Sequence, residues 1–332
     1  MLSKKSSQLT HTVGNYDEIN FNLKQDVPRR NVVDVPRIAI NNALQSVYRQ
    51  LLATGRRMKT VETYDYCFQL YIGATGIKYV DEICADNLIA FIDSMDNVAL
   101  TTKKFRLKSI KAVLLRFFEN GWLPEMFWRR IDVKIDNEVK EGSDIADLAY
   151  LIESIDKSTF TGFRDAVAIL LLFKTGIRIT TLAKLKNHHI DFDEQELRLD
   201  GSIMKNRKPL YLPLDDMICK QLKLLIEHNN IVRRHNKRRN NYVFINRLGA
   251  SLIETHSNTN AISRSLSNYA KKFDLKNINA HAIRRAYAKN LLEQGANIAI
   301  ISKALGHSSL AVTTEYLHFE LEEVSNKLRD YM

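Results

Sequence analysis

Two segments near the C-terminus are the most informative part of this chain: HAIRRAYA, residues His281 to Ala288, and LGHSSLAVTTEYLH, residues Leu305 to His318. In the first segment, His281 and Arg284 are three positions apart, which places both side chains on one face of a helix. In the second, His307 follows a glycine, and Tyr316 lies nine residues further along. The chain therefore concentrates imidazole, guanidinium and phenol groups in one short region.

A third segment, TGIRITTL (Thr175 to Leu182), contributes Arg178 about a hundred residues earlier. A phosphodiester gathers negative charge as a nucleophile adds to it, and planar guanidiniums bind such oxygens through paired, charge-assisted hydrogen bonds. Arg178 and Arg284 are suited to form that clamp.

A tyrosine hydroxyl has a pKa of about 10, so it needs a base or a strong positive field to attack at neutral pH. His281, His307 and the arginines could supply both. The leaving deoxyribose oxygen departs readily only if an acid protonates it. The pattern therefore predicts attack by Tyr316 on a phosphodiester, assisted by a lysine or histidine acid.

In order and spacing, these residues resemble the tyrosine recombinases, also called the phage integrase family. The resemblance covers nearly all of residues 37 to 332 and is most specific in the catalytic motifs. It implies a mainly α fold with a small antiparallel β-sheet in the catalytic domain, and a two-domain C-shaped clamp on DNA. The catalytic residues that it implies are Arg178, Lys205, His281, Arg284, His307 and Tyr316.

The lysine is assigned from the segment ELRLDGSIMKNRKPLYLPL (Glu196 to Leu214), whose alternating apolar residues predict a β-hairpin. Lys205 and Lys208 lie at its turn. In the family, the general-acid lysine stands eight residues before a Pro-Leu pair, which selects Lys205 and leaves Lys208 as the alternative. Solvated turn lysines are the simpler interpretation of both.

Two positions depart from the pattern of many relatives. Thr181 stands where an acidic residue is common, three places after Arg178, and Arg285 stands where a histidine is common. We therefore expect a different network of supporting contacts around the site. Three other tyrosines are rival nucleophiles, namely Tyr269, Tyr287 and Tyr331.

The composition agrees with a nucleic-acid partner. Lysine and arginine number 49 against 38 acidic residues, a net charge of +11, which favours a polyanion and predicts salt-sensitive binding. The three cysteines are scattered without metal-ligand spacing, which fits a reducing compartment. We expect no metal and no other cofactor, because the resemblance implies that bond energy is kept in a covalent protein–DNA link.

No segment of the sequence is typical of a membrane protein. The longest apolar run, AVAILLLF (Ala166 to Phe173), is far shorter than the roughly 20 residues that span a bilayer, and it predicts a buried core helix. The first ten residues lack an apolar leader segment. We therefore expect a cytoplasmic, nucleoid-associated protein without a membrane partner.

The length of 332 residues favours two domains. We expect a flexible N-terminal arm over residues 1–36, a helical core-binding (SAM-like) DNA-binding domain over 37–131, a linker over 132–142, and the catalytic domain over 143–332. In the tail, Leu317, Leu321, Val324 and Leu328 recur at helical spacing and predict a short amphipathic helix that docks on its own domain or on a neighbouring subunit.

A long helix, TTKKFRLKSIKAVLLRFFENG, combines an apolar stripe that includes Phe105 with an excess of basic residues. A solvated helix face is the simpler interpretation, and the resemblance favours contact with DNA. A basic cluster, RRHNKRR, follows another amphipathic helix. The residues that we expect to contact DNA are Arg56, Arg57, Lys59, Lys104, Lys108, Lys111, Arg233, Arg234, Arg238 and Arg239.

The expected partners are a double-stranded DNA recombination site and further copies of the chain, as a tetramer on two duplexes. Accessory DNA-bending proteins are a further partner that the resemblance allows. The expected function is site-specific recombination through a 3′-phosphotyrosine, for integration or excision of a mobile element or for resolution of DNA multimers. Two alternatives are relaxation of DNA, as by a type IB topoisomerase, and a non-catalytic DNA-binding regulator of the same fold.

Overall fold

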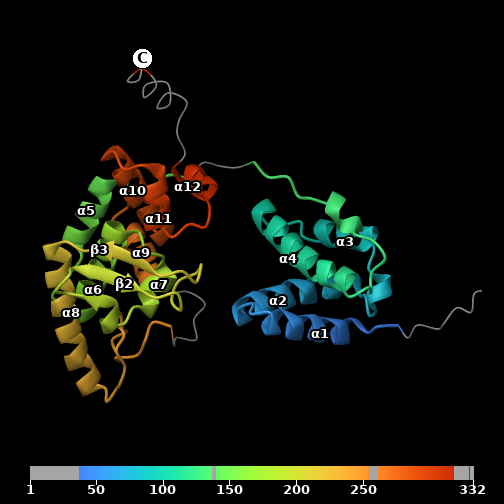
Figure 1. Cartoon of the computed structure of the whole chain (residues 1–332), viewed down its shortest axis with the longest axis horizontal. Coiled ribbons are helices and arrows are strands. Elements are labelled where there is room, and N and C mark those ends of the chain that lie inside the picture. The colour runs from blue at the N-terminus through green and yellow to red at the C-terminus, as the bar shows by residue number, and fades with distance from the viewer. Residues whose placement is uncertain (1–36, 137–139, 254–260, 318–328, 330–332) are drawn as a thin grey trace, which may run out of the picture. The chain divides into compact units, whose positions relative to one another are not determined.

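The computed structural model describes residues 37–136, 140–253, 261–317 and 329 of the chain. The chain forms two compact units, one ending at Asn137 and the other beginning at Glu138 (Figure 1). This division falls within residues 132–142, the expected linker. The expected arm, residues 1–36, and most of the expected tail helix lie outside the described residues.

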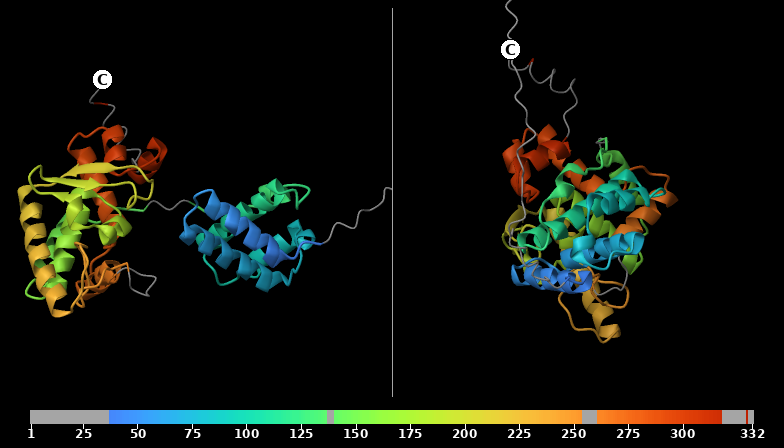
Figure 2. Two further views of the ribbon diagram at one scale, coloured as in Figure 1. Left: turned by 60° about the horizontal axis from the view of Figure 1, so that its bottom comes forward. Right: turned by 90° about the vertical axis from the view of Figure 1, so that its right-hand side faces the viewer.

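The first unit is helical (Figure 2). Its main helices are α1 (Ile40–Ala53), α2 (Met58–Thr75), α3 (Ala85–Asp93) and α4 (Leu100–Glu119), with 3-10 helices η1 (Val80–Glu82) and η2 (Phe127–Arg130). From α2, Phe68 meets Phe117 of α4 edge to face, with ring centroids 5.7 Å apart, and Tyr71 meets Phe91 of α3 at 5.6 Å. These aromatic contacts join α2, α3 and α4 in one core.

Helix α4 departs from the expected apolar stripe at one position. Leu107, Ile110, Val113, Leu114 and Phe117 are buried, whereas Phe105 is 55% exposed. Phe105 stands five residues before Ile110, about 140° away around the helix, so it leaves the buried face. Phe105, which we expected in the apolar stripe, is therefore exposed.

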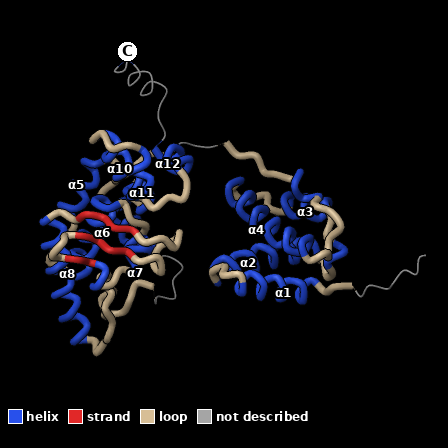
Figure 3. Tube along the Cα trace, in the orientation of Figure 1, coloured by secondary structure: helices blue, strands red, loops and turns tan. Residues whose placement is uncertain are grey.

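The second unit is mainly helical and contains one small sheet, which confirms the expected fold class. The sheet has the order β1-β2-β3, all antiparallel, and Leu197 of β2 pairs with Leu212 of β3 (Figure 3). The elements in chain order are α5 (Ile145–Ser154), α6 (Phe160–Thr175), α7 (Ile179–Lys184), η3 (Asn187–His189), β1 (Ile190–Asp191), β2 (Glu196–Leu199), β3 (Leu210–Pro213), α8 (Asp216–His235), α9 (Ala261–Lys272), α10 (Ala280–Glu293), α11 (Ile298–Ala304) and α12 (Leu310–Leu317).

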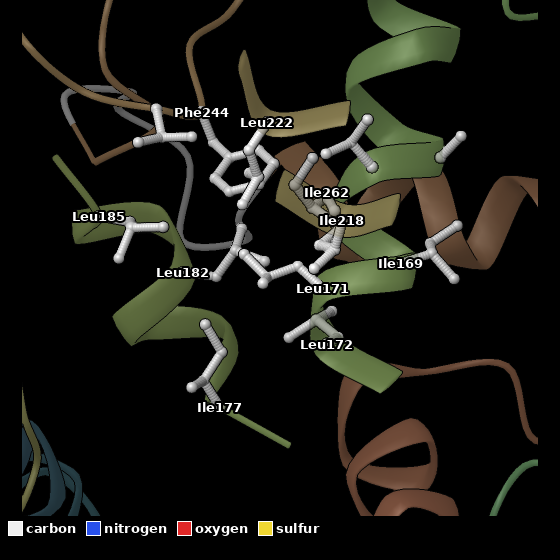
Figure 4. Packing of buried hydrophobic residues seen from close by; sticks show 14 of the residues in the cluster. Ile169, Leu171, Leu172, Ile177, Leu182, Leu185, Ile218, Leu222, Phe244 and Ile262 are labelled. Carbon is white, nitrogen blue, oxygen red and sulfur yellow. The ribbon is translucent and has the colours of Figure 1, made fainter. Parts of the chain in front are cut away.

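Helix α6 lies at the centre of the second unit. It carries the apolar run Ala166 to Phe173, and Ala168, Ile169, Leu171 and Leu172 have no exposed surface. Figure 4 shows Leu171 gathered with side chains from the neighbouring elements, among them Leu182, Ile218 and Leu222. The expected core helix is confirmed, and burial around its whole circumference makes it the rigid element on which the site is built.

A second, smaller apolar cluster holds the C-terminal helices. It consists of Ala288 of α10, Ile301 and Leu305 from α11 and its end, and Leu317 of α12. These four buried side chains fix α12 against α10 and α11.

Candidate active site

The turn at the end of α6 determines the position of Arg178. Gly176 follows the helix with φ +60°, a left-handed conformation that glycine adopts without strain. A Cβ atom at Gly176 would lie 2.2 Å from the ring of Tyr287 on α10. Glycine is therefore required both by the turn and by the close approach of α10, and the turn leads directly to Arg178 at the start of α7.

Among the site residues whose side chains the structure describes, Arg284 is the most deeply buried, with 3% of its surface exposed. From α10, its guanidinium donates to the carbonyl oxygens of Gly176 and Leu305. Arg178 also donates to the Leu305 carbonyl, at 3.4 Å. Two guanidiniums that are distant in sequence thus converge on one backbone oxygen, as two donors to a phosphate would.

His307 joins Arg284 to α12. Its Nε2 atom lies 3.1 Å from the Arg284 guanidinium, and its Nδ1 atom lies 2.9 Å from the hydroxyl of Thr313. Because a guanidinium only donates, Nε2 must accept, and the ring proton must be on Nδ1. Burial, followed by the charges of Arg284 and Arg178, lowers the pKa of His307 to about 4. The imidazole is therefore neutral at neutral pH.

His281 begins the same turn of α10 that carries Arg284, as the spacing predicted, and its side chain keeps contact with solvent. Partial desolvation lowers its pKa, and so do the positive charges of Arg284, Arg285, Arg178 and Lys205. A neutral imidazole can accept a proton, so His281 has the protonation state of a base.

Lys205 lies in the exposed tip between β2 and β3, as expected for a hairpin lysine. The tip contacts the loop before His307, because Asn206 donates to the carbonyl of Gly306 at 3.2 Å. The charge of Lys205 also contributes to the low pKa of His281. The structure thus brings Lys205 to the arginine and histidine cluster, which favours it over Lys208.

Tyr316 is in the last turn of α12, but its side chain lies outside what the structure describes. Its helix is fixed on both sides of the tyrosine: Thr313 is fully buried and contacts His307, and Leu317 is buried in the smaller cluster. The backbone of Tyr316 is therefore held close to His307.

Two of the rival tyrosines are poorly suited to attack. Burial raises the pKa of Tyr287, whose ring packs against Gly176. Tyr269 contacts Asp165 at 3.3 Å, and burial and this carboxylate raise its pKa to about 12. A higher pKa makes a phenol harder to ionise, which disfavours both tyrosines as nucleophiles. Tyr331 lies outside the described residues.

The structure places both residues that depart from the family pattern. Thr181 is 2% exposed, and its backbone N–H donates to the Arg178 carbonyl at 2.8 Å in the first turn of α7. Arg285 donates to the carbonyl of Glu141 at 2.9 Å. Arg285 therefore ties α10 to the beginning of the second unit.

One group in the described part of the chain has side chains close enough to hold a metal ion, namely His188, His189 and Asp200. However, Nδ1 of His189 accepts the backbone N–H of Lys186 at 2.9 Å, so its proton is on Nε2, 2.9 Å from Asp200. No electron pair of His189 is left for a metal. The hydrogen bond between His189 and Asp200 instead stabilises the beginning of the hairpin tip.

Two of the residues that we expect to contact DNA also make hydrogen bonds within the protein. Arg233 is 6% exposed and donates to Asn230, Asn240 and the Tyr242 carbonyl, so it holds its own loop together. Lys111 donates to the Ile131 carbonyl within the first unit, and burial lowers its pKa. Both side chains make internal contacts, and Arg233 also lines the cavity formed by the neighbouring basic residues, so DNA contact by either residue stays a prediction.

The other basic residues remain candidates. Arg234, Arg238 and Arg239 line a cavity of about 820 Å³ together with Lys237 at the end of α8. Arg56 and Lys108 are exposed, Arg57 and Lys104 are partly exposed, and Lys59 pairs with Glu62 at 3.2 Å.

Sequence reasoning missed three supporting groups: Thr313, Asn206 and the Leu305 carbonyl. Thr313 could have been found, because it precedes Tyr316 by three residues and so shares a helix face with it. The other two depend on contacts between segments that are distant in sequence.

In the part of the chain that the structure describes, every helix is too short or too polar to span a bilayer.

The sequence is similar to curated tyrosine recombinases. It is 29% identical to tyrosine recombinase XerC of Chlamydia muridarum, over 67% of this chain and 68% of that protein. It is 31% identical to tyrosine recombinase XerD of Listeria innocua, over 53% of this chain and 57% of that protein.

The fold is similar to that of a lambda integrase tetramer solved on a Holliday junction, with a TM-score of 0.64 and 16% identity. The match covers 85% of this chain and 78% of the integrase. The model of the phage integrase family matches residues 145–323, more than half of the chain. With this match over the region that holds the clustered arginines and histidines, the chain belongs to the phage integrase family.

Proposed function

We propose that this enzyme is a site-specific recombinase that cuts and rejoins DNA strands through a 3′-phosphotyrosine. The observation that carries the proposal is the convergence of Arg178 and Arg284 on the carbonyl of Leu305. Two guanidiniums that share one partly negative oxygen are able to share a phosphate oxygen in the same way, which supports the proposal. In the proposed complex, non-bridging phosphate oxygens replace that carbonyl as acceptors of the two guanidiniums.

The attack begins at Tyr316. Its hydroxyl oxygen forms a bond to phosphorus, and its proton passes to His281, whose low pKa leaves it neutral and able to accept. The two arginines offset the charge that develops on the phosphoryl oxygens. His307 holds the Arg284 guanidinium in place through Nε2.

The bond to the 5′ oxygen of the next nucleotide then breaks, and Lys205 supplies the proton that this oxygen takes up. The product is a free 5′ hydroxyl and a phosphate joined to Tyr316. Attack of a 5′ hydroxyl on that phosphate reverses each step: Lys205 regains its proton, and Tyr316 leaves with the proton from His281. No external energy source is needed, because one phosphoester is exchanged for another.

The proposed substrate is a double-stranded recombination site, and the proposed active form is a tetramer of this chain on two duplexes. The lambda integrase tetramer on a Holliday junction supports this, since its catalytic fold is shared. The positive net charge of +11 supports binding to the polyanion. The two outcomes proposed for strand exchange are movement of a mobile element and resolution of DNA multimers.

Trapping on nicked suicide DNA tests the proposal. Cleavage beside the nick releases a short fragment, so rejoining fails and the covalent complex accumulates. We expect the protein to be attached to a 3′ phosphate at one defined sequence. Attachment to a 5′ end, or no covalent complex on any sequence that the protein binds, would contradict the mechanism.

A second assay separates recombination from relaxation. A supercoiled plasmid that carries two copies of the trapped site should yield recombinant circles. Relaxed topoisomers without recombinants would instead identify a topoisomerase activity.

A further inference from the structure

The tip between β2 and β3 is closed by contacts of its own backbone. Gly201 packs so closely against the carbonyl of Arg207 that a Cβ atom at Gly201 would lie 2.4 Å from that oxygen. Arg207 has φ +60°, and its N–H donates to the Met204 carbonyl at 3.3 Å. The tip is therefore a defined turn, and Lys205 has a fixed place within it.

Asn206, the residue after Lys205, joins this turn to the catalytic loop. Its Nδ2 atom donates to the Gly306 carbonyl at 3.2 Å, and its Oδ1 atom accepts the Lys208 N–H at 3.2 Å. These two partners require opposite ends of the amide, so they also set its orientation. The contact spans a hundred residues of sequence and ends one residue before His307.

The tip and the loop approach closely because residue 306 is a glycine. Gly306 has φ +58°, and a Cβ atom there would lie 3.3 Å from the Met204 methyl group and 3.6 Å from Asn206. Met204 is 3% exposed and belongs to the core of the second unit. Lys205 is thus flanked by one residue buried in the core and one bonded to the loop before His307.

We propose that Asn206 is a positioning residue that holds Lys205 where it can protonate the leaving 5′ oxygen. The inference rests on the proposed role of Lys205 as general acid. A lysine side chain has several rotatable bonds and an exposed ammonium group, so fixing its backbone is the main way to place it. One hydrogen bond contributes about 1 kcal/mol, so its loss should slow cleavage by roughly fivefold to tenfold.

The hydrogen bond from Asn206 to Gly306 could instead hold the loop before His307 in place. Through His307, it would then orient the Arg284 guanidinium. Substitution of sulfur for the bridging 5′ oxygen separates these roles, because a thiolate leaves without being protonated. If a variant cleaves slowly because Lys205 is misplaced, its cleavage rate should recover on the sulfur substrate. A defect in the arginine clamp should remain, because charge still develops on the phosphoryl oxygens.

The experiment measures single-turnover cleavage of nicked suicide DNA with bridging oxygen or bridging sulfur. The variants are Asn206→Ala, Asn206→Asp and Lys205→Ala. Asn206→Asp has nearly the same shape but offers no donor to Gly306. As a matched control, Ser202→Ala removes a tip hydrogen bond to Asp200 that does not reach the Gly306 loop. Thermal melting checks that each variant is folded.

We expect both Asn206 variants to be slow on oxygen and to approach the wild-type rate on sulfur, in parallel with the larger effect of Lys205→Ala. Ser202→Ala should match the wild type on both substrates. If Lys205→Ala recovers on sulfur and the Asn206 variants do not, Asn206 does not act through the lysine and the inference is wrong. If Lys205→Ala itself does not recover, the proposed general acid fails, and the inference that depends on it fails with it.

Discussion

The hydroxyl of Thr313 contacts Nδ1 of His307 at 2.9 Å, and it lies one helical turn before Tyr316. The other nitrogen of the same ring contacts Arg284 at 3.1 Å. A single imidazole therefore connects the helix of the proposed nucleophile to the buried arginine of the clamp. Correct seating of α12 and correct orientation of Arg284 depend on the same pair of hydrogen bonds.

Replacement of Thr313 tests this connection. Thr313→Val keeps the shape but removes the hydroxyl that accepts the Nδ1 proton, and loss of a partner for a buried donor costs about 1–3 kcal/mol. We expect covalent complex formation to slow by roughly tenfold or more, with DNA affinity nearly unchanged. Thr313→Ser keeps the hydroxyl and is the matched control. Equal rates for the valine and serine variants would show that the hydrogen bond does not serve catalysis.

Removal of the Tyr316 hydroxyl should abolish the covalent step alone. Tyr316→Phe is expected to bind its DNA site as tightly as the wild type and to form no covalent complex on suicide DNA. Tyr287→Phe and Tyr269→Phe serve as controls, and both should still form the complex. A covalent complex with Tyr316→Phe would show that another residue attacks.

Acid should destabilise the second unit. The pKa of His307 falls from about 6.5 in the unfolded chain to about 4 in the folded one, so the unfolded chain binds the extra proton between these values. The stability that His307 contributes is present above pH 6.5 and is lost as the pH falls toward 4. At pH 5 the loss is on the order of 1–2 kcal/mol.

His307→Gln does not titrate, so its unfolding free energy should depend less steeply on pH over this window. Both tryptophans, Trp122 and Trp128, lie in the first unit, so their fluorescence is an internal control. Far-UV circular dichroism follows the helices of both units. The same pH slope in His307→Gln and in the wild type would mean that the histidine is not held neutral by the fold.

The salt dependence of DNA binding should distinguish outward lysines from inward ones. On α4, Lys104 and Lys108 have exposed surface, whereas Lys111 is bonded to the Ile131 carbonyl. Replacing both Lys104 and Lys108 by glutamine should make the slope of log K against log salt shallower by up to about 2. Lys111→Gln should leave the slope unchanged and lower the stability of the first unit. An unchanged slope in the double variant would place this helix face away from DNA.

The fold class and the convergence of the arginines and histidines could be predicted from the sequence because the relevant segments carry their own signals. Arg178 follows a glycine turn, and His281 and Arg284 share a helix face by spacing alone. The β-hairpin could be predicted because leucines alternate with other residues on both sides of Lys205. In each case the residues that determine the local structure are neighbours in the chain.

What could not be predicted depends on contacts between distant segments. Lys111 and Arg233 lie in basic stretches, but Lys111 donates to the Ile131 carbonyl, 20 residues away, and Arg233 donates to the Tyr242 carbonyl across its own loop. Asn206 is one turn residue among several until Gly306 is placed beside it. Charge alone does not tell which basic side chains face outward, because long side chains turn toward whichever acceptor the fold provides.

The helix of Tyr316 is attached through a small apolar cluster that is separate from the core around α6. Fewer buried contacts mean a lower free energy of local opening, so α12 should detach before the arginine clamp unfolds. Helix α12 then docks and undocks without unfolding of the rest of the second unit. Hydrogen exchange of its backbone amides would measure this equilibrium. In the proposed mechanism, the docked fraction of α12 determines how often a bound phosphodiester is cleaved.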